Sequence, residues 1–302
     1  MASVVLGQRR VVELLWTVVL ARGHALLEGP PGTAKTLLAK SLARTLNAGF
    51  SRIQFTPDLM PSDIVGTHIF DPSSGSFVLR EGPVFTDILL ADEINRTPPK
   101  TQAALLEAME ERGVTLDGAR RALAPGFTVF ATQNPIEFEG TYPLPEAQLD
   151  RFMMRIQVDF AEPVDELEVL KRYGSYDPQV KGPEEQLPAL LSVEDLAELA
   201  QLVAEVHCEI PIIEYVQQIL SASRRSRALA LGASTRAGLH LLRSARAKAL
   251  LSGRDFVRPD DIKELVAPVL AHRLIVEPDA QIEGLGAEQV VDDLLARIEV
   301  PR

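Results

Sequence analysis

A short segment near the start of the chain combines the residue types that bind phosphate groups. It follows the apolar run 25–27 and precedes a helical run that begins at residue 37. A strand, a glycine- and proline-rich turn and a helix, in this order, direct backbone N–H groups and the positive end of the helix toward a phosphate. The candidate nucleotide-binding residues are Gly29, Pro30, Pro31, Gly32, Thr33, Ala34, Lys35, Thr36 and Leu37.

Two side chains of this segment have distinct expected roles. Lys35 would reach the β- and γ-phosphates of a nucleotide, and the Thr36 hydroxyl would contact Mg²⁺. Ala34 stands where the strict pattern G-x-x-x-x-G-K-[ST] has its second glycine, so the pattern alone misses this segment. Alanine is the smallest residue with a Cβ atom, and we expect the loop to close all the same. In isolation, an ordinary Gly/Pro turn remains the alternative.

Two adjacent carboxylates follow the apolar run 88–91. Such a run is typical of a central parallel strand buried on both faces, and ligands bind at the carboxyl ends of strands in open α/β sheets. We expect Asp92 to hold Mg²⁺ through water and Glu93 to polarise an attacking water. A further strand, 127–132, leads to Asn134, whose amide would orient this water or contact the γ-phosphate. The alternative for the acidic pair is a strand that ends in an acidic turn.

Together these motifs resemble those of AAA+ ATPases, and more narrowly those of the MoxR family. The matching segments are 29–36, 90–96, 131–135 and 144–152. Alanine before the P-loop lysine is usual in that family, so the departure at position 34 supports the resemblance, which spans nearly the whole chain. It implies an α/β P-loop NTPase fold: a parallel-sheet αβα domain with hairpin inserts, followed by a smaller all-helical lid.

The resemblance implies further roles for single residues. Gly7 and Gln8 match a short motif that lines the adenine site, and Asn134 matches the sensor-1 position. Arg151 matches the arginine finger that a neighbouring subunit points at the γ-phosphate, and Arg236 matches the sensor-2 arginine of the lid. Such fingers contribute on the order of 10³ to 10⁵ in turnover, so an isolated subunit is expected to be a poor ATPase.

Both arginines have structural alternatives, and one glutamine has a possible switching role. Arg236 could be a solvated lid charge, and Arg151 could be an ion-pair partner instead of the finger. Gln54, at the end of the strand 53–55, is a candidate for holding Glu93 before activation. The possible partners of Arg151 are Glu146 and Asp150, and the alternative fingers are Arg96 and Arg155.

The composition is that of a globular protein. The chain has 302 residues, of which 24% are charged and 46% hydrophobic. Its single cysteine, Cys208, excludes an internal disulfide and fits a reducing compartment. The most apolar stretch, 11–21, contains Glu13 and is too short to span a membrane. We therefore expect a cytoplasmic protein with no membrane span, and the scattered histidines predict no structural metal site.

A basic segment contrasts with the formal net charge of −11. Residues 223–254 contain eight Lys or Arg residues and no Asp or Glu. This segment could contact nucleic acid, an acidic neighbouring subunit or only solvent. Few aromatic residues lie nearby for base stacking, and the acidic net charge disfavours nucleic-acid binding. The subunit contact or the solvated face is the favoured interpretation.

The order of apolar runs predicts three regions. Residues 1–160 alternate strand-like and helical segments, as in a parallel sheet covered on both faces. Residues 161–190 are expected to form a linker region, and residues 191–302 an all-helical lid. The first region carries two expected hairpins, one between residues 56 and 85 and one at 114–123. In related rings such inserts face the pore or the substrate, and surface decoration is the alternative.

The resulting hypothesis is a Mg²⁺-dependent ATPase that binds ATP and forms a homo-oligomer, expected to be a hexameric ring. The resemblance implies a chaperone-like remodeller in the assembly or metal-cofactor activation of a protein partner, and a protein with a von Willebrand factor A domain is the candidate partner. A nucleic-acid motor or loader is the rival, disfavoured by the acidic charge. A small-molecule kinase is a third possibility, but the adjacent carboxylates favour activation of water. The partner's identity stays open.

Overall fold

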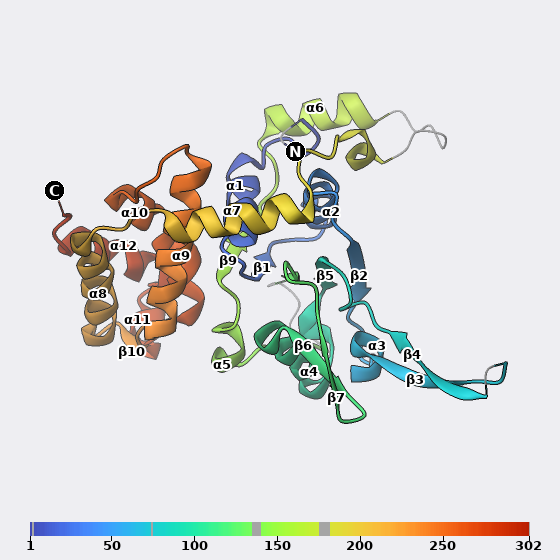
Figure 1. Cartoon of the computed structure of the whole chain (residues 1–302). Coiled ribbons are helices and arrows are strands. Elements are labelled where there is room, and N and C mark those ends of the chain that lie inside the picture. The colour runs from blue at the N-terminus through green and yellow to red at the C-terminus, as the bar shows by residue number, and fades with distance from the viewer. Residues whose placement is uncertain (2, 74, 135–139, 175–181, 302) are drawn as a thin grey trace. The chain divides into compact units, whose positions relative to one another are not determined.

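A computed structural model describes residues 1–302 except 2, 74, 135–139, 175–181 and 302 (Figure 1). Its contacts divide the chain into two compact units. The first comprises Met1–Trp16, His24–Leu144 and Ile156–Ala197, and the second comprises Thr17–Gly23, Pro145–Arg155 and Glu198–Arg302. The short segment Pro145–Arg155, which contains Arg151, therefore belongs with the C-terminal region.

The first unit is built on a five-stranded sheet in which β1 (Ala25–Glu28), β2 (Phe50–Gln54), β5 (Ile88–Asp92) and β8 (Thr128–Gln133) pair in parallel. The runs 25–27, 53–55, 88–91 and 127–132 expected from the sequence overlap four of its strands, which confirms the predicted α/β class. Leu26, Leu89 and Phe130 are completely buried in the three central strands, as expected for a sheet covered on both faces. In spatial order the strands are β2, β5, β8, β1 and β9 (Met154–Gln157).

The register of the parallel strands brings the polar residues to one edge. Ile53 is level with Ala91 and Gln54 with Asp92, while Glu28 of β1 is level with Gln133 of β8. The helices in or entering this unit are α1 (Arg9–Leu20), α2 (Lys35–Thr45), α3 (Pro61–Val65), η1 (Ile94–Arg96), α4 (Pro99–Glu111), α6 (Pro163–Tyr173), η2 (Pro183–Gln186) and α7 (Val193–Glu205). The carboxyl ends of the strands thus meet the start of α2.

Two β-hairpins are inserted into this unit, as expected. The first pairs β3 (Gly66–Asp71) with β4 (Ser76–Glu81), and the second pairs β6 (Gly113–Leu116) with β7 (Ala119–Ala122). The second closes through Asp117 and Gly118, both with positive φ, which is the geometry an Asp-Gly turn favours.

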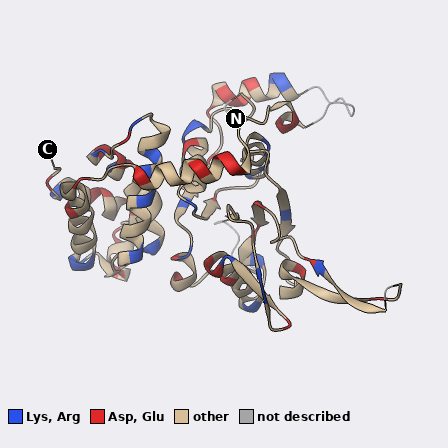
Figure 2. Cartoon of the chain, viewed as in Figure 1, with Lys and Arg blue, Asp and Glu red and all other residues tan. Residues whose placement is uncertain are grey.

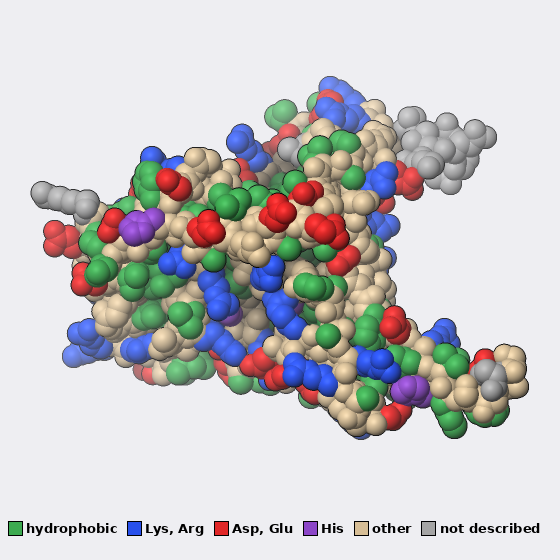
Figure 3. Space-filling model, viewed as in Figure 1, with side chains coloured by type: hydrophobic (Ala, Val, Ile, Leu, Met, Phe, Trp, Pro, Cys, Tyr) green, Lys and Arg blue, Asp and Glu red, His purple; other side chains and the backbone are tan. Residues whose placement is uncertain are grey.

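A polar contact joins the two hairpins, since His68 Nδ1 lies 2.5 Å from Asp117 Oδ2. The first hairpin also exposes apolar side chains, which are visible as green atoms along it in Figure 3. Phe70 and Phe77 are 56% and 71% exposed and pack edge to face, with ring centroids 5.5 Å apart. A pore or substrate role for these inserts stays a prediction.

The C-terminal unit is mainly helical, but the all-helical expectation needs one correction. The short strands β10 (Leu229–Leu231) and β11 (Ile275–Val276) form an antiparallel ribbon. Both are too short to show the alternating pattern that marks a strand in the sequence. The helices that lie wholly in this unit are α5 (Glu146–Leu149), α8 (Ile210–Arg225), α9 (Thr235–Leu251), α10 (Pro259–Leu270), η3 (Ala271–Arg273), α11 (Pro278–Ile282) and α12 (Ala287–Arg297).

The region predicted as a linker, 161–190, contains α6 and η2, and its described residues belong to the first unit. A helix start lies at Ser192, where Ser192 Oγ accepts from the Asp195 N–H and the Asp195 carboxylate accepts from the Ser192 N–H. The domain boundaries at residues 160 and 190 stay a prediction. Among the described residues, no helix is long and apolar enough to cross a membrane.

Several basic residues of the segment 223–254 make contacts inside their own unit; the Lys and Arg positions of α8 and α9 are blue in Figure 2. Lys248 pairs with Glu264, and Arg254 makes a two-pronged ion pair with Asp261. Arg224 donates to a backbone carbonyl oxygen at 2.8 Å. These contacts give the basic residues an intramolecular role, which weakens the case for a nucleic-acid face.

Candidate nucleotide site

The phosphate-binding loop closes through a left-handed residue at its end. Ala34 has φ 63° and ψ 23°, a conformation that costs an L-residue about 1–2 kcal/mol. It caps α2, whose first residue is Lys35, so the unpaired N–H groups at the start of that helix adjoin the loop. At the other end, a Cβ atom on Gly29 would lie 2.1 Å from the Val158 carbonyl oxygen, so glycine is required there.

The Lys35 ammonium lies against the loop itself. Its Nζ donates to the carbonyl oxygens of Gly29 at 2.9 Å and Pro30 at 2.7 Å, and to the Thr33 hydroxyl at 3.1 Å. These contacts use all three N–H donors of the ammonium. Partial burial lowers the pKa of Lys35, and the carboxylates of Asp92 and Glu93 oppose that shift. An anionic phosphate in the loop would compensate the same desolvation.

Both carboxylate oxygens of Asp92 have partners. Oδ1 accepts from the Thr132 hydroxyl at 2.6 Å, and Oδ2 accepts two N–H bonds from Arg52, at 2.6 and 3.0 Å. Asp92 is only 8% exposed, whereas the Arg52 side chain is 47% exposed. A nearly buried carboxylate needs a cation beside it, and here a half-exposed surface arginine supplies that charge.

Glu93 is held by a glutamine from the neighbouring strand. Gln54 Nε2 donates to Glu93 Oε2 at 2.6 Å, and Arg96 Nε lies 3.2 Å from the same oxygen. The Glu93 backbone is left-handed, with φ 57°, and its N–H donates to Thr132 Oγ1 at 2.8 Å. The contact expected for Gln54 is thus present, and it directs the carboxylate toward Gln54.

These groups surround a cavity of about 530 Å³. The P-loop and the start of α2 form one wall, and the strand ends form the other, with Asn134 at its margin. The lining residues are Gly29, Pro31, Gly32, Thr33, Ala34, Lys35, Thr36, Leu37, Arg52, Asp92, Glu93, Thr132, Gln133 and Asn134. Cation and carboxylates therefore face one space, the arrangement that a metal-bound polyphosphate requires.

The oxygen donors in this cavity fit Mg²⁺. Thr36 and Asp92 both line it, and hydroxyl and carboxylate oxygens are the ligands that Mg²⁺ prefers. Among the described residues, no group of three or more His, Cys, Asp or Glu side chains forms a metal site. A cation here would depend on few protein ligands and on the nucleotide phosphates, as Mg²⁺ commonly does.

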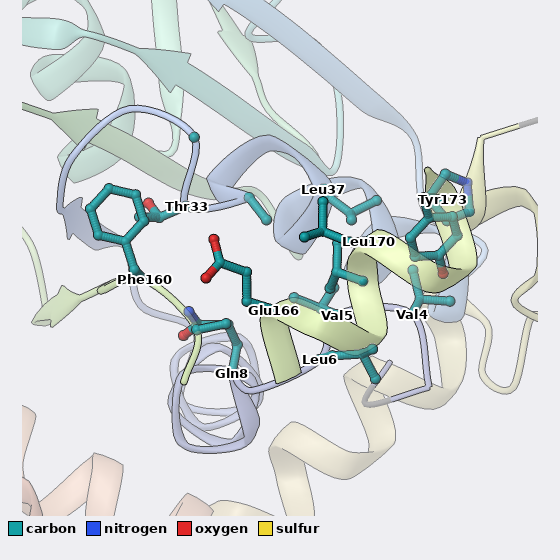
Figure 4. A pocket seen from close by; sticks show the side chains of 15 residues that line it. Val4, Val5, Leu6, Gln8, Thr33, Leu37, Phe160, Glu166, Leu170 and Tyr173 are labelled. Atoms are coloured by element: carbon teal, nitrogen blue, oxygen red, sulfur yellow. The ribbon is translucent and has the colours of Figure 1, made fainter. Parts of the chain in front are cut away.

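A second cavity of about 250 Å³ adjoins the first and shares the loop residues Gly32, Thr33, Ala34 and Leu37. Apolar side chains from the N-terminal segment and α6 dominate its walls (Figure 4). The others that line it are Val4, Val5, Leu6, Gln8, Phe160, Ala161, Glu166, Val169, Leu170, Tyr173 and Pro183. An apolar slot with few polar groups beside a phosphate cavity suits a nucleobase.

Two polar side chains distinguish this second cavity. Gln8 is 8% exposed and is anchored by a 2.7 Å bond from its Nε2 to the Asp159 carbonyl oxygen. In Figure 4 the Glu166 carboxylate extends into the space between Thr33 and Gln8. Gly7 precedes Gln8 with φ 72°, and a Cβ atom there would approach the Asp165 carboxylate to 3.0 Å. Gly7 therefore permits the close approach of the N-terminal segment to α6.

The two arginines expected to act on the nucleotide lie in the other unit. Arg236, at the start of α9, lies 3.7 Å from Asp150 Oδ2. Arg151 lies two residues after the end of α5, and its backbone N–H donates to the Gln148 carbonyl oxygen at 3.2 Å. The roles of both in the reaction, like those of the other site residues, stay predictions.

Sequence reasoning missed several residues of the site. Arg52 and Thr132 bind Asp92, and Phe160 and Glu166 line the second cavity, called here the base cavity. Thr132 stood in a recognised strand, and its hydroxyl at the carboxyl end of a central strand was an available signal. Arg52 gave a weaker signal: it is a charged residue two positions before Gln54, on the same face of the strand. No local pattern marks Phe160 or Glu166, because only the fold brings α6 and the residues just before it beside the P-loop.

Comparisons with known proteins agree with this geometry. Residues 24–154 match the profile described as "ATPase family associated with various cellular activities (AAA)", and residues 221–294 match an AAA lid domain. Chaperone MoxR1 of Mycobacterium tuberculosis is 42% identical, over 99% of this chain and 80% of its own length. Protein MoxR of Paracoccus denitrificans is 36% identical, over 99% and 94%.

A solved structure shares the whole architecture. The crystal structure of a protein from Cytophaga hutchinsonii, presumed to be an ATPase, has 39% identity and a TM-score of 0.91, covering 100% of this chain and 92% of its own. An uncharacterized protein of Bacillus subtilis, YeaC, is 44% identical over 99% of this chain and 92% of its own length. With the P-loop, the acidic strand end and the lid all present, the chain belongs to the MoxR family of AAA+ ATPases.

Proposed function

We propose that this protein hydrolyses ATP with Mg²⁺ and that it does so as a ring of identical subunits. The observation that carries the proposal is the pair of adjoining cavities in the first unit. One presents Lys35, Thr36, Asp92 and Glu93 to a polyphosphate, and the other offers an apolar slot beside Gln8. ATP carries a polyphosphate and a nucleobase in one molecule, and the two cavities share the loop residues that would lie between them.

Different residues of the site have different proposed roles in ATP hydrolysis. The loop N–H groups and Lys35 would bind the phosphates, with the ammonium exchanging loop carbonyls for phosphate oxygens. Mg²⁺, when held at Thr36 and Asp92, would neutralise charge on the phosphate oxygens. Glu93 would accept a proton from the attacking water, and Asn134 would orient that water. Gln54 holds the Glu93 carboxylate in the conformation described here.

The oligomeric part of the proposal depends on Arg151. A finger contributed by a neighbouring subunit requires a repeating head-to-tail interface, and such an interface forms a ring when the rotation between subunits closes. A hexamer is the expected size. The relatives named Chaperone MoxR1 and Protein MoxR support action on a protein partner, and we extend this to assembly or metal-cofactor activation of that partner, with a von Willebrand factor A domain as the candidate module.

The proposal is tested by ATP turnover and by mixing variants. Lys35→Ala should abolish nucleotide binding, whereas Glu93→Gln should bind ATP without hydrolysing it, and EDTA should stop the wild type. Lys35→Ala and Arg151→Ala subunits each lack a different half of a shared site, so their mixture should recover activity. If every single variant still hydrolysed ATP at the wild-type rate, the proposed ATP site would be refuted. DNA-stimulated, salt-sensitive turnover would instead support the nucleic-acid rival.

A further inference from the structure

Arg273, in the lid, is a nearly buried arginine whose contacts are concentrated on one short segment. Its side chain is 3% exposed, and Nε donates to Asp150 Oδ1 at 2.7 Å. Nη2 donates to the carbonyl oxygens of Asp150 at 3.0 Å and Phe152 at 2.6 Å. Nη1 donates to the carbonyl oxygen of Met153 at 3.3 Å. One guanidinium therefore binds the backbone on both sides of residue 151.

Two histidines and the end of α10 add further contacts around Arg273 and the Phe152 carbonyl oxygen. His272 Nε2 lies 3.1 Å from the same Phe152 carbonyl oxygen, and His240 Nδ1 accepts from Arg273 Nη2 at 2.7 Å. Burial, and then the Arg273 charge, lower the pKa of His240 to about 3, so His240 is the neutral acceptor that this bond needs. Arg273 also donates to the Val269 carbonyl oxygen, which ties it to the end of α10.

Asp150 is shared between two lid arginines. While Oδ1 accepts from Arg273, Oδ2 lies 3.7 Å from Arg236 Nη1. An almost fully buried arginine is strongly destabilising unless it is paired, so Asp150 is required at this place. The same carboxylate links α9, η3 and the backbone that leads into Arg151.

We propose that Arg273 and Asp150 are positioning residues for Arg151. Within one subunit, the Asp150 carboxylate also links Arg236 to the segment that carries Arg151. The inference rests on the proposed function, in which Arg151 acts at the neighbouring subunit's nucleotide. The lid then holds the finger by its two flanking peptide groups. A change at Arg236, the expected contact to the subunit's own nucleotide, would reach the next site through one shared carboxylate.

Kinetics of single variants give the first test. Asp150→Asn keeps an acceptor for Arg273 but loses the charge, and Arg273→Lys keeps a charge but loses the branched set of donors. Because small misplacements of a catalytic group reduce rates by up to about 10²-fold, kcat should fall roughly tenfold or more. The affinity for a fluorescent ADP analogue should stay within about twofold, since the P-loop is untouched. Unchanged kcat in both variants would overturn the proposal.

The lid contains a matched control. Arg254 and Asp261 form another ion pair of low exposure, 15% and 4% for the two side chains, with bonds of 2.7 and 2.8 Å. Neither has a described contact with the segment 145–155. Asp261→Asn should lower the thermal midpoint by as much as Asp150→Asn and leave kcat close to wild type. An equal loss of kcat in the control would reduce the role of Asp150 to lid stability and overturn the proposal.

Mixing experiments then separate action in trans from action in cis. Glu93→Gln subunits carry an intact finger but a site that cannot hydrolyse, and Asp150→Asn subunits carry an unchanged P-loop and acidic pair. Random mixing at equal amounts should recover roughly a quarter of the wild-type rate if sites are independent, because each head-to-tail interface joins one site to the next finger. The same mixture with Arg151→Ala in place of Asp150→Asn calibrates this value.

The outcomes distinguish the positioning role of Asp150 from the proposed action of Arg151 at the neighbouring subunit's site. Recovery in both mixtures supports the positioning role. Recovery with Arg151→Ala but not with Asp150→Asn, with subunit exchange verified, overturns this inference and leaves the proposed function standing. Failure with Arg151→Ala overturns the trans finger itself, and the inference with it. If Arg273→Lys does not fold, Asp150→Asn alone decides the result.

Discussion

The contact between Gln54 and Glu93 gives a prediction about the resting rate of the enzyme. In the proposed mechanism Glu93 must face a water at the γ-phosphate, and in the structure its Oε2 accepts from Gln54 Nε2 at 2.6 Å. We expect Gln54→Ala to release the carboxylate and raise the basal ATPase rate. A role in which Gln54 simply supports the active conformation would have the opposite effect.

The size of the effect follows from the exposure of the pair. A hydrogen bond to a charged group contributes about 1.5–3 kcal/mol when buried. The Glu93 side chain is 33% exposed, and Arg96 at 3.2 Å continues to hold it after the substitution. Solvent screening and this remaining contact reduce the expected change to about 1 kcal/mol. That corresponds to roughly a fivefold increase in kcat.

The assay is steady-state phosphate release at saturating ATP, together with the dissociation constant of a fluorescent ADP analogue. Gln157→Ala is a suitable control, because Gln157 also ends a strand and donates to a carboxylate, that of Asp159, at 3.3 Å. The double variant Gln54→Ala/Glu93→Gln should be inactive. A kcat for Gln54→Ala that is equal to or below wild type, with unchanged ADP affinity, would refute the reasoning.

Three further predictions follow from the site and the lid. Gly29→Ala should destabilise the protein by more than Gly32→Ala, since a Cβ at 29 meets a backbone oxygen at 2.1 Å whereas one at 32 meets nothing within 4 Å; denaturant unfolding of both compares them. Arg52→Gln should lower the Mg²⁺ concentration needed for half-maximal nucleotide binding, because it removes the cation that occupies Asp92; calorimetric titration with Mg²⁺ measures this. Folded His240 binds its proton only near pH 3, whereas the unfolded residue binds it near pH 6.5, so stability should fall as the pH drops through this window, by up to about 1.4 kcal/mol per pH unit, and His240→Asn should flatten the profile of urea midpoints against pH.

The sequence by itself determined the parts of this protein whose chemistry is local. The P-loop is a continuous segment, and its glycines, its lysine and the following helix predict a phosphate site without knowledge of the rest of the chain. The acidic pair Asp92-Glu93 follows a fully apolar strand, and parallel strands deliver their carboxyl ends to one edge. Alternating apolar runs likewise sufficed for the sheet and for both hairpins.

Tertiary structure decided everything that depends on residues distant in the chain. Arg52 meets Asp92 across 40 positions, and Arg273 meets Asp150 across 123. No periodicity or motif encodes such pairs, because side-chain contacts between separate elements depend on how those elements pack. For the same reason the sequence did not reveal that α6 lines the base cavity, or that the segment with Arg151 is bound to the lid. Local spacing specifies which chemistry is present, and packing specifies which groups hold it in place.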